Sequence, residues 1–205
     1  MQQLQRLFAV VRNSFEICTT KDDGCATHVH IGTASSFNLS QIRKLSQGVF
    51  LFQDILSVAS PFDEYSRTVP LPSSHYAEVQ SLNKNEILMA MNPPLPPTNL
   101  DTSAEWDRKY VAWNFLSLDT LGTIEYRQGI FSTSPRDAVG WITLALAAVH
   151  VFLDDDLDVL FRAHRESGGQ SLLSLPRTAL TYLLRNSEYL TVSDPCLDIP
   201  PDFLD

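Results

Sequence analysis

Two short runs of alternating polar and apolar residues constrain the fold of this chain more than any other feature. The first run is THVHIG at residues 27–32, and the second is TIEYRQ at residues 123–128. Alternation with a period of two is typical of a strand that has one face on a core and the other on polar surroundings. We therefore predict that both runs are strands of one sheet.

The polar faces of these two strands hold the candidate functional residues. Because residues i and i+2 of a strand point to the same side, His28 and His30 share a face, as do Glu125 and Arg127. If the two polar faces meet, one surface holds two imidazoles, a carboxylate and a guanidinium, which can bind a divalent metal and a phosphate together. Taken separately, each pair also has a structural interpretation: a chance pair of histidines, and a surface ion pair of little energetic value.

Composition favours a single folded domain and excludes some classes of partner. The chain has 205 residues, of which 44% are hydrophobic, and its formal net charge is −9 with no basic run. A cationic surface supplies most of the attraction to nucleic acids and anionic membranes, so we expect neither as a partner. We predict one domain over residues 1–186, followed by an acidic, proline-containing tail over residues 187–205.

The cysteines and the apolar stretches predict the cellular location. Cys18, Cys25 and Cys196 are an odd number at spacings that match neither a disulfide framework nor a metal knuckle, so we expect reduced thiols. No signal peptide is evident at the N-terminus. The most apolar stretch, residues 138–153, is shorter than the ~20 residues of a membrane-spanning helix. We predict a soluble, cytoplasmic protein.

The remaining periodicity predicts an α+β protein with an antiparallel sheet. A strand over residues 106–118 precedes the second run by a short turn and should form a hairpin with it. Asp154, Asp156 and Asp158 lack the glycine and the spacing of a calcium loop, so we expect solvated acids. The predicted helices span residues 4–17, 39–58, 74–91, 134–153, 157–165 and 176–186, with a proline-rich segment at 92–97.

This order of elements resembles the amidoligase family. The similarity covers roughly residues 1–165 and depends on the HVH strand, on Arg67 in a proline-containing loop, on the segment from Arg108 to Asn114, and on the TIEYR motif. That family belongs to the carboxylate–amine ligase superfamily of glutamine synthetase and glutamate–cysteine ligase. The resemblance implies a curved antiparallel sheet with helices on its outer face, and ATP with divalent metals on its concave face.

The resemblance also implies a reaction and residue roles. ATP would activate a small-molecule or peptide carboxylate as an acyl phosphate, and an amine would attack it to form an amide. The cofactors would be ATP and Mg²⁺, or Mn²⁺ in view of the histidine ligand. Carried over by position, the metal ligands are His28 and Glu125, the catalytic residues are His30 and Arg127, and the contacts to ATP are His30, Arg127, Arg108 and Arg67.

One departure from the family pattern leaves several interpretations open. In the superfamily, a strand with paired glutamates (ExE) precedes the opening helix and supplies much of the metal shell, whereas this sequence starts at the helix. Glu16 lies at the predicted end of that helix and does not easily replace the pair. The sequence is then a truncated ligase, a homologue that kept the fold and lost the reaction, or a chain whose metal site another chain completes.

Two other functions remain as alternatives. A non-catalytic, degenerate amidoligase-like protein would act by binding alone. An HxH metal-dependent hydrolase would need an eight-stranded barrel and later histidines at strand ends. The remaining histidines, His75, His150 and His164, fall in predicted helices, which makes the hydrolase the less favoured alternative.

Overall fold

The computed structural model describes residues 2–14, 26–58, 74–92, 111–154 and 156–166. Several features predicted from the sequence lie outside these residues. They are Arg67, Arg108, the three cysteines, residues 93–97 of the proline-rich segment, the helix predicted at 176–186 and the acidic tail.

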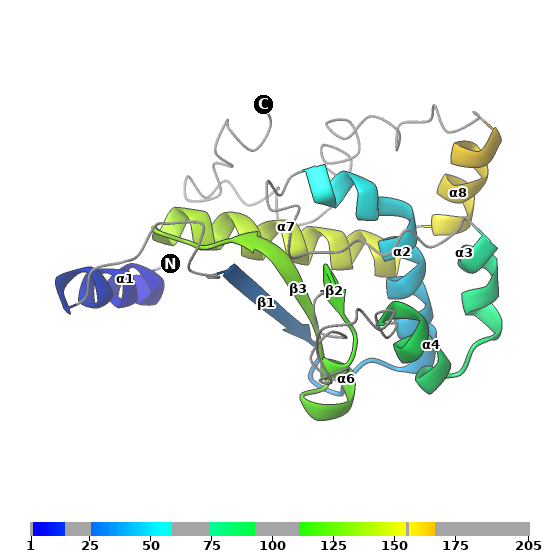
Figure 1. The fold of residues 1–205 in the computed structure, drawn as a ribbon, viewed down its shortest axis with the longest axis horizontal. Helices are drawn as coiled ribbons and strands as arrows, with labels where there is room; N and C mark the ends of the chain where they lie inside the picture. Colours follow the sequence, from blue (N-terminus) through cyan, green and yellow to red (C-terminus); the bar gives the residue numbers. More distant parts are fainter. Residues whose placement is uncertain (1, 15–25, 59–73, 93–110, 155, 167–205) are drawn as a thin grey trace, which may run out of the picture.

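The described part of the chain is α+β and mostly helical, which confirms the predicted fold class (Figure 1). The glutamine synthetase-like form of this fold, with a curved sheet, stays a prediction. In chain order the elements are α1 (Gln2–Ser14), β1 (Ala26–Gly32), α2 (Leu39–Val58), α3 (Ser74–Glu78), the 3-10 helix η2 (Val79–Ser81), α4 (Lys84–Met91), β2 (Trp113–Asn114), α6 (Ser117–Thr120), β3 (Thr123–Ile130), α7 (Pro135–Asp154) and α8 (Leu157–Glu166).

The three strands form an antiparallel sheet in the order β1-β3-β2. The two alternating runs are therefore neighbours, as predicted, and His30 lies directly opposite Glu125. The register shifts between the pairs Thr27–Gly129 and Val29–Tyr126. Over this interval one residue of β1 faces two residues of β3, which is a bulge of the kind that redirects side chains.

One face of the sheet is covered by helices. The alternate residues Val29, Ile31, Ile124 and Tyr126 are buried, and they belong to the hydrophobic core. Helix α7 lies across this face (Figure 1) and contributes Trp141, whose ring centroid is 6.2 Å from that of Tyr126. Helix α2 packs on α7 and completes the layer. The opposite face bears the polar side chains of the two runs.

Helix α7 begins with a reciprocal cap and is the main core helix. The Ser134 hydroxyl accepts from the Asp137 amide (3.2 Å), and the Asp137 carboxylate accepts from the Ser134 amide (2.9 Å). Among the described residues, α7 is the one helix long and apolar enough to cross a membrane by length and composition. Within the structure, 56% of its most apolar window is buried, in part through packing against β1 and α2.

Two predictions of local structure were wrong in detail. The helix predicted over residues 74–91 is divided into α3, η2 and α4, because the backbone is extended at Leu82 and Asn83 starts a new helix. Asn83 and Glu86 form a capping box there. Of the strand predicted over residues 106–118, residues 106–110 lie outside the described residues; the described part holds β2 and a paired residue at Val111, and the chain then turns into α6. Gly122, with φ of +71°, returns the chain into β3, so the predicted hairpin is present with a longer turn.

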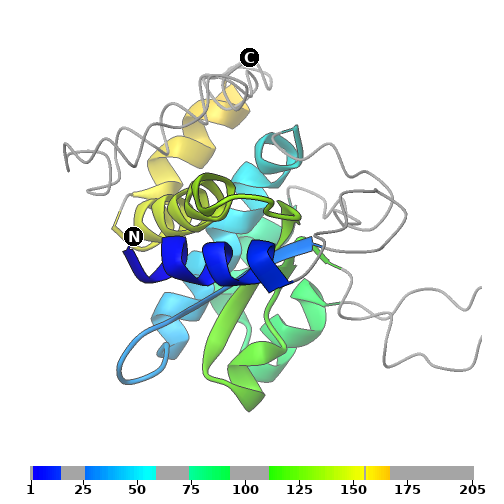
Figure 2. The same cartoon turned by 90° about the vertical axis from the view of Figure 1, so that its left-hand side faces the viewer.

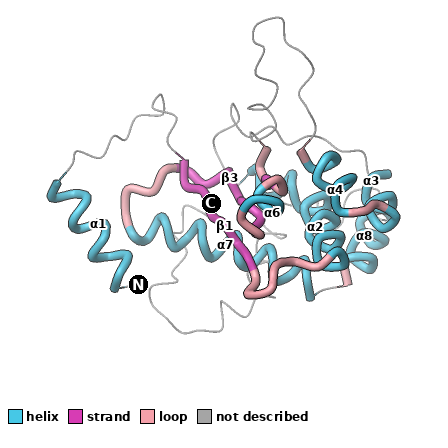
Figure 3. The backbone as a smooth tube through the Cα atoms, turned by 90° about the horizontal axis from the view of Figure 1, so that it is seen from below, coloured by secondary structure: helices cyan, strands magenta, loops and turns pink. Residues whose placement is uncertain are grey.

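The helices are distributed unequally around the sheet. Helices α2, α3, α4 and α8 gather at one end of the molecule, and α1 lies at the opposite end (Figure 3). Figure 2 shows α1 beside α7 at that end, where the Arg12 guanidinium donates to the Thr133 carbonyl (2.6 Å). The polar face of the sheet lies between these two ends.

Candidate functional site

Glu125 is the centre of the polar face. Glu125 is only 5% exposed, and three charged or ionisable side chains from β1 and β3 surround its carboxylate. The Glu125 Oε1 atom lies 2.9 Å from His28 Nδ1, 3.5 Å from His30 Nε2 and 3.0 Å from Arg127 Nη1. The structure therefore brings together the four residues that the two strand motifs place on one face.

The neighbours of Glu125 form an accessible rim around a buried acid. The side chains of His28 and His30 are 35% and 39% exposed, and that of Arg127 is 19% exposed. The bulge between β1 and β3 contributes to this arrangement, since Arg127 is one of the two residues opposite His28. A ligand can reach the imidazoles and the guanidinium, whereas Glu125 lies beneath them.

The environment keeps Glu125 ionised. Burial by itself raises the pKa of a carboxyl group, but hydrogen bonds from His28 and Asn114 and the charge of Arg127 together lower the pKa of Glu125 to about 2. Because Glu125 is then a carboxylate at neutral pH, the Nδ1 atom of His28 must hold the proton between them. In its neutral form the His28 ring then keeps an unprotonated Nε2 atom, which is the form that binds a metal.

Asn114 is a member of this cluster that the sequence motifs did not identify. Its Nδ2 atom donates to Glu125 Oε2 at 2.8 Å from the neighbouring strand β2, and the residue is 4% exposed. The sequence held only a weak signal for this role. An asparagine within an apolar strand is costly to bury unless its amide is hydrogen-bonded, so its presence there indicates a buried partner. His30 has a further partner in Thr123, whose hydroxyl lies 3.0 Å from its Nδ1 atom.

The donor set of the cluster fits a divalent ion in part. The 2.9 Å contact between His28 Nδ1 and Glu125 Oε1 is a hydrogen bond, so His28 would bind a metal through Nε2, and Glu125 through an oxygen released from this bond. In the part of the chain that the structure describes, however, no group of three or more His, Cys, Asp or Glu residues could hold a metal ion. A metal here would have two protein ligands and complete its shell with phosphate and water, as Mg²⁺ often does.

Comparison with known proteins identifies the family of the chain. A family model described as "Putative amidoligase enzyme" matches residues 1–149, which contain both strand motifs and most of α7. The chain belongs to the amidoligase family. Neither the curated proteins nor the solved structures gave a significant match. The family predicted from the sequence is thus confirmed, and the amidoligase residues Arg67 and Arg108 lie within the matched range, although their roles stay predictions.

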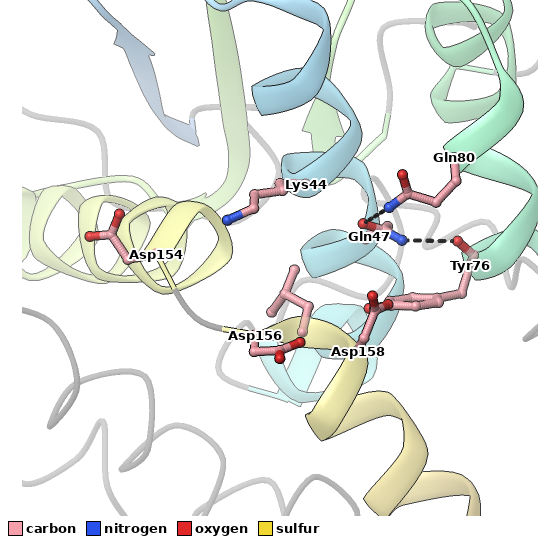
Figure 4. A pocket seen from close by; sticks show the side chains of 8 residues that line it. Lys44, Gln47, Tyr76, Gln80, Asp154, Asp156 and Asp158 are labelled. Atoms are coloured by element: carbon pink, nitrogen blue, oxygen red, sulfur yellow. Dashed lines mark hydrogen bonds between the residues drawn. The ribbon is translucent and has the colours of Figure 1, made fainter.

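A polar cavity of this amidoligase lies on the helical side of the molecule, apart from the Glu125 cluster. It has a volume of about 300 Å³ and lies between α2, α3 with η2, and the junction of α7 with α8 (Figure 4). Its polar groups are mostly bonded to one another or to backbone. Tyr76 donates to Asp158 (3.0 Å), Gln80 donates to Gln47 (2.8 Å), and the Lys44 ammonium donates to the carbonyl of Leu153 (2.6 Å).

The acidic residues of this cavity behave as the sequence predicted. Asp154, Asp156 and Asp158 are all exposed. Asp154 pairs with His150 (2.9 Å), and Asp156 accepts from the Val159 amide (3.3 Å) at the start of α8. Their exposure confirms that these three acids are solvated. We assign the candidate functional site to the Glu125 cluster.

Proposed function

We propose that this amidoligase joins a carboxylate to an amine at the expense of ATP. In the first step a substrate carboxylate oxygen attacks the γ-phosphorus, the bond to ADP breaks, and an acyl phosphate forms. In the second step the amine nitrogen attacks the acyl carbon, phosphate leaves, and the nitrogen loses a proton. The observation that supports this proposal is the convergence of His28, His30 and Arg127 on the buried carboxylate of Glu125.

The arrangement suits phosphoryl transfer because such reactions depend mainly on positioning and on neutralising charge. Arg127 would bind the transferred phosphoryl group. A guanidinium has five N–H donors, so it can hold a carboxylate and contact phosphate oxygens at the same time. Its bond to Glu125 (3.0 Å) would fix its position before ATP arrives. His30, at the rim, would donate to the phosphates of ATP.

His28 and Glu125 would hold a divalent cation, Mg²⁺ or Mn²⁺, His28 through its Nε2 atom and Glu125 after exchanging its bond to Nδ1 for the metal. When bound, the cation would neutralise charge on the phosphates of ATP. An imidazole ligand is more usual for Mn²⁺ than for Mg²⁺, which favours oxygen. The ionised state of Glu125 at neutral pH supports this role, since a protonated carboxyl is a poor ligand. Arg67 and Arg108 would provide secondary contacts to ATP or to the substrate carboxylate.

Calorimetric titration of the purified chain with ATP and Mn²⁺ or Mg²⁺ tests this proposal. We expect metal-dependent binding by the wild type and none by Glu125→Ala or Arg127→Ala. Lys84→Ala, which removes an exposed ion pair with Asp119 (2.6 Å), is the control and should bind normally. A screen of acids and amines for release of ADP and phosphate then identifies substrates. Absence of binding by folded wild-type protein would overturn the proposal.

A non-catalytic amidoligase that only binds its ligand is the second candidate. The observation that favours it is the saturation of Glu125, whose two oxygens accept from His28, Arg127 and Asn114. A metal would have to displace or share these bonds. Binding of ATP or of a carboxylate without a metal requirement, and without ADP release in any acid and amine combination, would favour this candidate.

A further inference from the structure

A chain of buried amides lies behind Glu125, on the side away from the histidines. Asn92, the residue that ends α4, is 0% exposed, and its Nδ2 atom donates to Asn114 Oδ1 at 3.2 Å. Asn114 in turn donates to Glu125 Oε2 at 2.8 Å. Three elements, α4, β2 and β3, are thereby joined by buried side-chain hydrogen bonds.

Backbone donors fix the orientation of both amides. The Oδ1 atom of Asn92 accepts from the Phe115 amide (3.0 Å), and the Oδ1 atom of Asn114 accepts from the Leu116 amide (3.0 Å). A backbone N–H can only donate. If either side-chain amide were rotated by 180°, its NH₂ group would face that N–H, and two donors would meet without an acceptor. The NH₂ group of Asn114 must therefore point to Glu125.

This fixed donor has a consequence for the candidate site. With its Oε2 atom bonded to Asn114 and both oxygens contacted by Arg127 Nη1 (3.0 and 3.2 Å), the Glu125 carboxylate cannot rotate freely about its last bond, and its Oε1 atom stays beside His28. Because a carboxylate oxygen can only accept a hydrogen bond, the Nδ1 atom of His28 beside Oε1 must carry the proton. An arrangement in which outer residues orient a carboxylate and thereby select a histidine tautomer is common around metal ions.

We propose that Asn114, held in place by Asn92, is a positioning residue that fixes the rotation of Glu125 and so keeps His28 in the tautomer with a bare Nε2 atom. Its effect on metal binding rests on the proposed function, whereas its effect on His28 does not. Satisfied buried amides of this kind specify one arrangement, because every alternative leaves a polar group without a partner.

Nitrogen-15 NMR of the histidine rings tests the proposal at an alkaline pH at which the imidazoles are neutral. Wild-type His28 should show a single tautomer protonated at Nδ1. Asn114→Leu removes the donor at similar volume, and His28 should then show a mixture of both tautomers. If His28 keeps the wild-type pattern in folded Asn114→Leu protein, the proposal is overturned.

Ser117→Ala is the matched control. Ser117 is 7% exposed and accepts the other N–H of Asn114 (3.3 Å), but it has no bond to Glu125. Its loss should therefore destabilise the same region and leave the His28 tautomer unchanged, whereas a change equal to that of Asn114→Leu would contradict the proposal. If Asn114→Leu does not fold, Asn114→Ser takes its place, because the shorter hydroxyl does not reach Glu125.

Binding of Mn²⁺ in the presence of ATP separates the proposed function from the proposed role of Asn114. It is measured by the electron paramagnetic resonance signal of free Mn²⁺. Loss of an outer-sphere partner typically weakens metal binding roughly 10- to 100-fold, and we expect this for Asn114→Leu but not for Ser117→Ala. If the wild type does not bind Mn²⁺ with ATP, the proposed function fails, and the tautomer of His28 still decides whether Asn114 positions Glu125.

Discussion

Strand β3 buries apolar side chains on one face and a carboxylate on the other. Ile124 and Tyr126 are 0% exposed and pack against the helical layer, where shape and area determine stability. Glu125, between them in the sequence, is almost as deeply buried on the other face, where it is surrounded by hydrogen-bond donors. Burial on one face excludes water to stabilise the fold, and burial on the other strengthens the electrostatic interactions of one carboxylate.

The largest effect should come from the apolar face. Phe152 of α7 is 0% exposed and packs against Phe52, with ring centroids 5.5 Å apart, and against Trp113 at 6.1 Å. We expect Phe152→Ala to lower the free energy of unfolding by about 3–5 kcal/mol, measured by denaturant titration. Val159→Ala on the exposed side of α8 is the control, with a change within about 0.5 kcal/mol. A loss below about 1 kcal/mol for Phe152→Ala would show that α7 is not held as described.

The polar face should dominate the acid sensitivity of the fold. Since the pKa of Glu125 is lowered from 4.5 to about 2 on folding, its ionised form contributes stability that is present above pH 4.5 and lost as the pH falls toward 2. The contribution is on the order of 3 kcal/mol. Comparing the unfolding free energy of wild type and Glu125→Gln between pH 6 and pH 2 isolates it, because the glutamine does not titrate. Parallel pH profiles would contradict the described environment of Glu125.

A close approach of α2 and α7 offers a test of packing within the helical layer. A Cβ atom on Gly48 would overlap the ring of Phe152. We expect Gly48→Ala to cost about 1–3 kcal/mol despite the better helix propensity of alanine. The same substitution in a Phe152→Leu background should cost less, since the smaller side chain leaves room. Equal costs in the two backgrounds, from denaturant titration of all four proteins, would argue against this contact.

The smallest effect expected is at the cap of α7. Ser134→Ala removes the hydroxyl that accepts from the Asp137 amide and should lower the free energy of unfolding by about 1 kcal/mol. It should leave the difference between pH 6 and pH 2 unchanged, because the cap lies apart from the Glu125 cluster in the hydrogen-bond network. A change in the acid profile equal to that of Glu125→Gln would instead show that the two regions are coupled.

Local pattern determined a large part of this protein. The period of two in residues 27–32 and 123–128 correctly assigned His28, His30, Glu125 and Arg127 to one face, because side-chain direction in a strand depends only on parity. The cap at Ser134 and the bounds of α2 were also readable from short-range signals. The break at Asn83 was readable as well, since an asparagine followed by a glutamate three residues later is a capping signal.

Tertiary structure alone decided how the carboxylate is held. The sequence does not show which of many polar residues reaches Glu125, and the answer, Asn114 supported by Asn92, depends on how α4, β2 and β3 pack together. The bulge that places Arg127 opposite His28 is likewise a property of the pairing between β1 and β3, not of either strand. Periodicity fixes the face of a side chain, because it is local; hydrogen-bond partners depend on the packing of the whole chain.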